Sequence, residues 1–228
     1  MNIKKMKNIN GVYSYYQEEI KRLATINLVP GKTIYREDLI KDENIEYRNW
    51  VLSRSKLAAA IYKGLSELPI KEGSIILYLG VSSGTTASHI SDIVGIDGRI
   101  YCVDFSPRSI RDFISVCEDR KNLFPILADA RIPESYRMLV EEVDGIYMDV
   151  AQPQQAKILV NNAKMFLKPN GWIMLCVKSQ SIDSTISPDI VYQEQKSILE
   201  VNNFEIKDFI KLKPFSLDHV LIYAKYQG

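Results

Sequence analysis

The sequence has few of the residues that mark secreted, membrane-spanning or metal-binding proteins. Among its 228 residues there are three cysteines and two histidines, and no cysteine belongs to a CxxC pair. An odd number of cysteines among apolar neighbours suits a reducing compartment. We therefore expect Cys102, Cys117 and Cys176 to fill the core, and we expect no metal site. The longest apolar runs, such as 172–177, have the length of a strand, whereas a membrane-spanning helix needs about 20 residues.

Targeting signals and charge are also sparse. The first residues contain lysines with no apolar stretch behind them, so the sequence predicts no signal peptide and a cytoplasmic protein. The net charge is +1 overall, with +4 over residues 1–56 and −3 over the remainder. Free-standing nucleic-acid binders are usually more basic, because their affinity depends largely on neutralising phosphates. If the protein acts on nucleic acid, we expect another molecule to bring the protein and the nucleic acid together.

What is present is a globular composition, with 46% hydrophobic and 25% charged residues, arranged in two successive patterns. Over residues 1–50, the segments GVYSYY, LATINLVPGKTIY and IEYRNW predict a small β-sheet. From Ser53 the period becomes helical, and a helix is expected to run up to Pro69 with four apolar residues on one face: Leu57, Ile61, Leu65 and Leu68.

The rest of the sequence alternates strands with helices. Strands are expected at 74–80, 99–104, 123–128, 143–149 and 172–178, and helices at 85–94, from Ser106-Pro107, near 134–141 and at 154–167. This alternation predicts a parallel, doubly wound sheet. After a helix from Ser187-Pro188, the segments 204–213 and 219–226 are only five residues apart, so these last strands must be antiparallel.

A mostly parallel α/β sheet of seven strands that ends in an antiparallel hairpin resembles the S-adenosylmethionine-dependent methyltransferases. We therefore expect a small N-terminal β domain, residues 1–52, and a methyltransferase domain, residues 53–228.

Candidate cofactor-binding residues follow the first three parallel strands. Gly80 and Gly84 would let a ligand approach the backbone and the amides of the next helix, although tight packing would explain them too. Asp104 lies 20 residues after Gly84, the spacing at which an acid accepts the ribose hydroxyls of a nucleoside cofactor. The alternative for Asp104 is a helix cap. Asp129 is placed to meet an adenine amino group or, alternatively, to form an Asx turn.

Candidate catalytic residues follow the fourth and fifth strands. Asp149 and Lys178 should face each other, because these strand ends converge on one crevice. A structural ion pair is the alternative to a catalytic one. Lys56, at the start of the first helix, is expected at the edge of the same crevice. His219 lies on the last strand, where a structural role is the alternative, and His89 is expected on the surface of its helix.

Longer motifs are more specific than these single residues. They are RSKLAAAI, LYLGVSSGTTASHISDIVG, ADAR, YRMLVEEVD, MDVAQPQQ and IDST, together with the N-terminal LATINLVPGKTIY and EYRNW. The sequence thereby resembles the fibrillarin family, the guide-directed RNA 2′-O-methyltransferases of box C/D ribonucleoproteins. It lacks the Gly/Arg-rich tail of eukaryotic members and so resembles the archaeal form. It departs from the family at residues 51–53, Val-Leu-Ser in place of the usual Asn-Pro-Phe, and at Asp104, where Glu is common.

The resemblance implies a cofactor, a catalytic set and partners. The cofactor is S-adenosylmethionine, bound by Thr85, Thr86, Asp104, Phe105, Asp129, Ala130, Asp149, Val150, Ala151 and Gln152. The catalytic set implied is Lys56, Asp149, Lys178 and His219. Lys178 would stabilise the developing alkoxide or act as general base, Asp149 would orient it, and the other two would position ribose or phosphate.

The partners implied are a box C/D guide RNA, its rRNA or tRNA target, a helical scaffold protein and a kink-turn-binding protein. Two other functions stay open at this point. One is a self-sufficient methyltransferase of small molecules or protein side chains, and the other is a non-catalytic assembly subunit.

Overall fold

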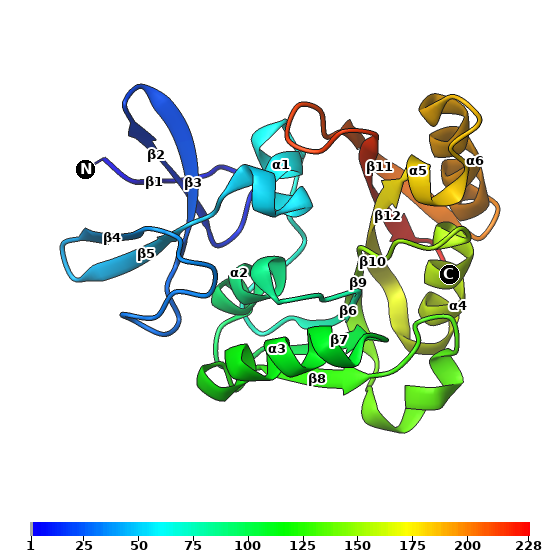
Figure 1. Ribbon diagram of the computed structural model, residues 1–228, viewed down its shortest axis with the longest axis horizontal. Helices are drawn as coiled ribbons and strands as arrows, with labels where there is room; N and C mark the ends of the chain where they lie inside the picture. The colour runs from blue at the N-terminus through cyan, green and yellow to red at the C-terminus, as the bar shows by residue number, and fades with distance from the viewer. Residues whose placement is uncertain (1) are drawn as a thin grey trace.

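Two β-sheets organise the computed structural model, which describes residues 2–228 (Figure 1). The smaller sheet is antiparallel, with the strand order β1-β2-β3-β5-β4. Its strands are β1 (Lys4–Lys5), β2 (Val12–Gln17), β3 (Ile20–Ile26), β4 (Leu39–Asp42) and β5 (Ile45–Asn49). The small N-terminal sheet predicted from the sequence is confirmed, with β1 and β4 as additional strands.

The larger sheet has seven strands in the order β11-β12-β10-β9-β6-β7-β8. They are β6 (Ile75–Leu79), β7 (Arg99–Asp104), β8 (Leu123–Leu127), β9 (Val143–Met148), β10 (Leu167–Lys178), β11 (Phe204–Lys211) and β12 (His219–Tyr226). Strands β6 to β10 pair in parallel, whereas β12 runs antiparallel to both β10 and β11. The predicted fold class is therefore confirmed. The strand order reverses at β6, which lies between β7 and β9, with Ile76 opposite Gly145.

The helical segments agree with the predicted alternation, but two predicted helices differ from the structure and two short segments, 52–54 and 179–182, were not predicted. They are η1 (Leu52–Arg54), α1 (Lys56–Tyr62), α2 (Thr85–Val94), α3 (Pro107–Asp119), η2 (Pro133–Leu139), α4 (Gln155–Phe166), α5 (Ser179–Ile182) and α6 (Pro188–Glu200). The first helix is shorter than predicted because the chain turns at Gly64, with φ +102°. The expected helix near 134–141 is a 3-10 segment with non-helical backbone at Tyr136. No helix among residues 2–228 is long and apolar enough to cross a membrane.

The large sheet separates two apolar cores, because successive side chains of a strand point to opposite faces. On one face Tyr78 and Cys102 pack with α1, α2 and α3, and on the other Leu77 and Val103 pack with α4 and α6. The N-terminal sheet contributes Val12 and Leu23 to the first core, as does Trp50 directly after β5, and α1 and α2 lie between the two sheets in Figure 1. Because the two parts share this core, their division at residue 52 remains a prediction.

A buried ionic network also joins the N-terminal sheet to α2. The side chain of Asp92, on α2, is fully buried and forms ion pairs with Arg48 (2.9 Å) and Arg120 (2.6 Å). Asp92 also accepts hydrogen bonds from the Thr25 hydroxyl at 2.7 Å and the Leu28 amide at 3.0 Å. Arg48 forms a further buried ion pair with Glu37 at 2.5 Å. Two guanidinium groups therefore share two buried carboxylates.

His89 belongs to this interface, and its predicted surface position is wrong. Its ring is fully buried, stacked on Trp50 at 4.7 Å, with Nδ1 2.8 Å from the Thr25 hydroxyl and Nε2 2.8 Å from the Tyr35 hydroxyl. Burial and the nearby Arg48 and Arg120 hold the pKa of His89 well below its ordinary value. The imidazole is therefore a neutral structural group.

Candidate functional site

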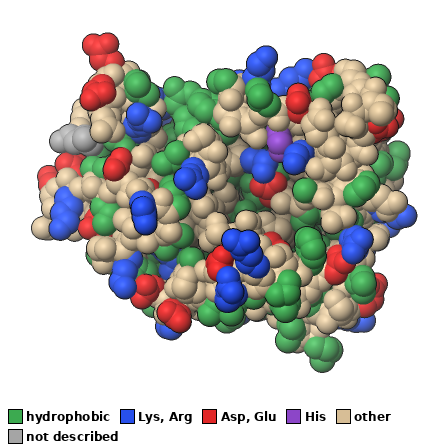
Figure 2. All heavy atoms as spheres, viewed as in Figure 1, with side chains coloured by type: hydrophobic (Ala, Val, Ile, Leu, Met, Phe, Trp, Pro, Cys, Tyr) green, Lys and Arg blue, Asp and Glu red, His purple; other side chains and the backbone are tan. Residues whose placement is uncertain are grey.

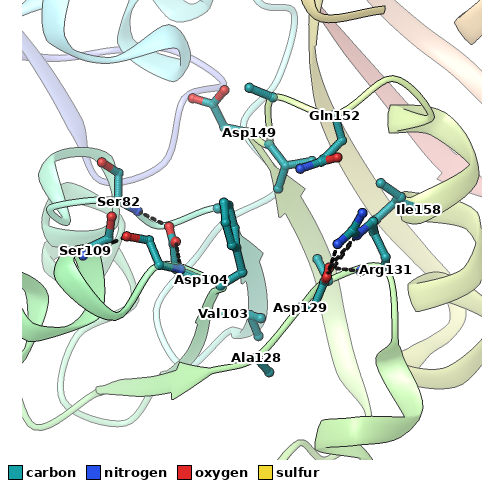
Figure 3. Close-up of a pocket in the computed structure, with 16 residues that line it drawn as sticks. Ser82, Val103, Asp104, Ser109, Ala128, Asp129, Arg131, Asp149, Gln152 and Ile158 are labelled. Atoms are coloured by element: carbon teal, nitrogen blue, oxygen red, sulfur yellow. Dashed lines mark hydrogen bonds and ion pairs between the residues drawn. The ribbon is translucent and has the colours of Figure 1, made fainter.

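The carboxyl ends of β6, β7, β8 and β9 surround a cavity of about 350 Å³, which we call the main cavity because most of the predicted cofactor-binding residues line it (Figure 3). This is the position at which open parallel sheets bind ligands, next to the strand where the order reverses. Asp104, Asp129 and Asp149 surround the cavity from three sides in Figure 3. Apolar side chains complete its wall, among them Val103, Phe105, Val150 and Ile158.

Asp104 binds two backbone amides next to the cavity, and its role toward ribose hydroxyls stays a prediction. Its Oδ1 accepts a hydrogen bond from the Ser106 amide at 3.0 Å, just before α3, and its Oδ2 accepts one from the Ser82 amide at 2.9 Å. A carboxylate has about four lone-pair sites, so Asp104 can still accept hydrogen bonds from two hydroxyl groups in the cavity. The next residue, Phe105, is 66% exposed and offers an aromatic face to a flat ligand.

Asp129 is held by a residue that the sequence reasoning missed. The guanidinium of Arg131 donates to both carboxylate oxygens, with Nε to Oδ1 at 3.0 Å and Nη2 to Oδ2 at 2.6 Å. The Arg131 amide also donates to Oδ1 at 2.9 Å, which is the Asx turn considered as the alternative. The Arg131 hydrogen bonds hold the pKa of Asp129 below its ordinary value, against a smaller opposing effect of burial. The sequence feature that could have indicated this ion pair is the basic residue two positions after Asp129.

The two glycines of the first loop are explained by close packing. A Cβ on Gly80, at φ +83°, would lie 2.6 Å from the Asp149 carbonyl oxygen, and a Cβ on Gly84, at φ +88°, would lie 2.5 Å from the Phe113 ring. Gly80 lines the main cavity, whereas Gly84 and the following Thr85 and Thr86 do not. The packing alternative therefore accounts for Gly84.

Thr86 instead lines a smaller cavity of about 100 Å³ next to the main one. Its hydroxyl donates to Ser55 Oγ at 2.9 Å, and Ser55 Oγ in turn caps α1 by accepting the Ala58 amide at 3.3 Å. Asp149 and Lys56 also line this cavity, and Asp149 lines both. Thr86 is therefore connected, through Ser55, to the helix start that carries Lys56.

Asp149 forms its ion pair with Lys56, and no ion pair joins it to Lys178 among residues 2–228, so the structural ion pair considered as the alternative is absent there. Lys56 Nζ lies 2.7 Å from Oδ2 and 2.8 Å from Oδ1 of Asp149. Burial is the largest single influence on Lys56 and lowers its pKa, but the charge and hydrogen bonds of Asp149, together with Cys176, outweigh it, so the pKa of Lys56 is raised. The sequence placed Lys56 at the crevice edge but could not place its side chain. Among the described residues, Lys178 has no carboxylate ion-pair partner.

Lys178 and His219 complete this edge of the site from adjacent strands. They are directly opposite each other in the β10–β12 pairing, and His219 Nδ1 lies against the Leu217 carbonyl. Burial lowers the pKa of His219, and the charges of Lys56, Asp149 and Lys178 all act on it. The four predicted catalytic residues thus come together. Figure 2 shows basic side chains on several sides of a hollow on this face.

The arrangement can bind a nucleoside-like ligand and bring a polar acceptor to it. Carboxylates, an exposed aromatic ring and apolar walls suit a nucleoside, and a cavity of this volume is typical of small-molecule sites. The paired Lys56 and Asp149 stand at the boundary between the two cavities. Residues 3–228 match the sequence model of a family described as fibrillarin.

The chain belongs to the fibrillarin family. A fibrillarin-like rRNA/tRNA 2′-O-methyltransferase of Staphylothermus marinus is 52% identical over 228 residues, which are 100% of this chain and 97% of that one. The crystal structure of Aeropyrum pernix fibrillarin with natively bound S-adenosyl-L-methionine has a TM-score of 0.92 at 52% identity and covers 98% of each chain. A chain of a fibrillarin/Nop5p complex has a TM-score of 0.85 at 38% identity, covering 96% of this chain and 99% of that one.

The resemblance to fibrillarin that the sequence motifs indicated is therefore confirmed. The structure brings most of the predicted cofactor-binding and catalytic residues into one site. Those in the wall of the main cavity are Gly80, Asp104, Phe105, Asp129, Ala130, Asp149, Val150, Ala151 and Gln152. Roles for these residues in binding and catalysis remain predictions.

Proposed function

We propose that this chain transfers a methyl group from S-adenosylmethionine to ribose 2′-hydroxyls of rRNA and tRNA, at sites chosen by a box C/D guide RNA. In this proposal it is the catalytic subunit of a ribonucleoprotein. The observation that carries the proposal is the position of Asp149, which lines the cofactor-type cavity and also binds Lys56 at the edge formed with Lys178 and His219. The relative with bound S-adenosyl-L-methionine supports the cofactor.

The residues of the main cavity fit S-adenosylmethionine, which supplies a methyl group on a positively charged sulfur. Asp104 would accept the ribose hydroxyls, and Phe105 would lie against the adenine. Asp129 would accept from the adenine amino group in place of one of the Arg131 hydrogen bonds, because Arg131 donates to about as many sites as a carboxylate has. The acidic wall also suits the positive charge of the ligand.

The residues at the edge would bind and activate the acceptor. A ribose hydroxyl is a weak nucleophile at neutral pH. The acceleration of methyl transfer must therefore come from the alignment of this hydroxyl and from stabilisation of its developing negative charge. Lys178 would act on the acceptor oxygen as the cation or the general base, since Asp149 is held by Lys56. Asp149 and Lys56 would lie between the bound cofactor and the acceptor. His219 would position the ribose or phosphate of the acceptor.

The partners and the cellular location belong to the same proposal. A fibrillarin/Nop5p complex is known for a relative, which supports a protein scaffold for this chain. We propose in addition a guide RNA, its target RNA and a kink-turn-binding protein. The three free cysteines suit the reducing cytoplasm.

Asp104→Ala is expected to weaken S-adenosylmethionine binding by roughly tenfold to a hundredfold. Loss of a charge-assisted hydrogen-bond acceptor typically costs about 1.5–3 kcal/mol. Isothermal titration calorimetry of the isolated chain measures the effect. Asp97→Ala is the control, because Asp97 is exposed before the other end of the same strand. Equal affinity of the two variants would remove Asp104 from the site.

The isolated chain is expected to methylate RNA negligibly and to become active in the full assembly. The part that holds the cavity, residues 57–228, has a net charge of −3 and so attracts a polyanion little. Methylation of a guide-complementary target with radiolabelled S-adenosylmethionine would be compared for the chain alone, the chain plus guide, and the chain with guide, scaffold and kink-turn-binding protein. Efficient, site-selective methylation by the chain alone would overturn guide dependence.

A further inference from the structure

Gln155 links the ends of the two strands that carry Asp149 and Lys178. It is the first residue of α4 and is fully buried. Its Oε1 accepts a hydrogen bond from the backbone amide of Lys178 at 3.1 Å, and its Nε2 donates to the backbone carbonyl of Val150. One side chain therefore holds the turn after β9 and the end of β10 at the same time.

This link lies where the backbone pairing of the two strands has ended. The parallel register of β9 and β10 extends to Met148 opposite Leu175. Beyond that pair, Lys178 is held by β12 on one side, through its pairing with His219, and by Gln155 on the other. A primary amide suits this position, because it has one group that accepts and one that donates.

We propose that Gln155 is a positioning residue, which fixes the Lys178 backbone relative to the turn formed by Asp149, Val150, Ala151 and Gln152. The inference rests on the proposed function, in which Lys178 acts on an acceptor held against the cofactor. Displacement of a reacting group by about 1 Å can reduce a rate by about a hundredfold. Gln155 thus controls the rate of methyl transfer without touching substrate.

Gln195 provides a matched control on the neighbouring helix. It is 4% exposed on α6, and its Oε1 accepts the backbone amide of Ala156, the residue after Gln155, at 2.9 Å. Gln195→Leu therefore removes one buried hydrogen bond from the same turn of α4 without touching either strand end. Gln155→Leu removes both hydrogen bonds between the strand ends at similar side-chain volume.

The test measures kcat and the KM for target RNA in the complete assembly at saturating S-adenosylmethionine, together with melting temperature. We expect Gln155→Leu to lower kcat by about tenfold to a hundredfold with KM changed less than threefold, and Gln195→Leu to leave both within threefold. Equal effects of the two substitutions on kcat, or a fall in melting temperature alone, would overturn the proposal. If Gln155→Leu does not fold, Gln155→Glu replaces it, because it keeps the acceptor for Lys178 and loses the donor to Val150.

A crystal structure of the Gln155 variant separates this inference from the proposed function. We expect the Lys178 backbone to move away from the Val150 turn, and an unchanged backbone would overturn the inference even if no RNA substrate were methylated. An inactive wild-type assembly with a displaced Lys178 in the variant would instead contradict the proposed function and leave the positioning role supported.

Discussion

Lys178→Ala is expected to abolish methyl transfer in the assembled particle, with a loss of roughly 10²–10⁴-fold at an unchanged fold. Lys178 ends β10 opposite His219, and its ammonium has no carboxylate partner in residues 2–228, so its removal leaves no buried charge unpaired. Asp149→Ala is expected to have the same effect on turnover, because it releases Lys56 and alters the cavity wall. Single-turnover methylation with radiolabelled S-adenosylmethionine measures both losses, and cofactor affinity must be measured for the Asp149 variant.

The same two strands provide a control for Lys178. Lys168 on β10 forms an ion pair with Asp144 on β9 at 2.7 Å, and both side chains are 37% exposed. This pair precedes the buried part of the strands, at the end away from the site. Lys168→Ala should therefore leave turnover unchanged. If Lys178→Ala lowers the melting temperature while the folded protein keeps its turnover, the role of Lys178 is structural.

Asp92→Ala is expected to lower the free energy of unfolding by about 3–5 kcal/mol, the typical result when one partner of a buried ion pair is removed. Without this carboxylate, Arg120 loses its buried ion pair, Arg48 retains only Glu37, and the Leu28 amide loses its acceptor. Urea denaturation followed by circular dichroism measures the change.

The control for Asp92 is Asp112→Ala on α3. Asp112 forms an ion pair with Arg111, but its side chain is 52% exposed, and such pairs contribute about 0–1 kcal/mol. Similar losses in the two variants would show that the buried network contributes little to the attachment of the N-terminal sheet.

The order of the elements could be predicted from the sequence because it depends on local patterns. Strand-length apolar runs, helical spacing and a five-residue connection gave the seven-stranded sheet, and parallel topology then placed Asp104, Asp129 and Asp149 at one edge. Choices between nearby partners could not be predicted in this way. Asp149 binds Lys56 rather than Lys178 because of side-chain direction across 93 positions of sequence, which no local pattern records.

The burial of side chains on α2 could not be predicted from the sequence of that helix alone, because a distant part of the chain covers it. His89 was predicted to lie on the exposed surface of α2. In the structure the N-terminal sheet covers this surface, so that His89 is buried against Thr25 and Ser88 against Arg48. Leu65 and Leu68 were predicted to lie on the buried face of the first helix. They are buried, but they lie in the chain after α1 has ended.

The position of β6 between β7 and β9 also determines when the site forms as the chain is synthesised. β6 can pair with β9 only after residue 145 and the residues that follow it have been made, because Ile76 pairs with Gly145. Pairings between such distant segments form slowly. All residues that line the main cavity are present in the growing chain once Ile158 on α4 has been made, whereas Lys178 and His219 are added later. A nascent chain stalled between residues 158 and 178 would therefore contain every residue of the main cavity and lack two of the four residues proposed for catalysis.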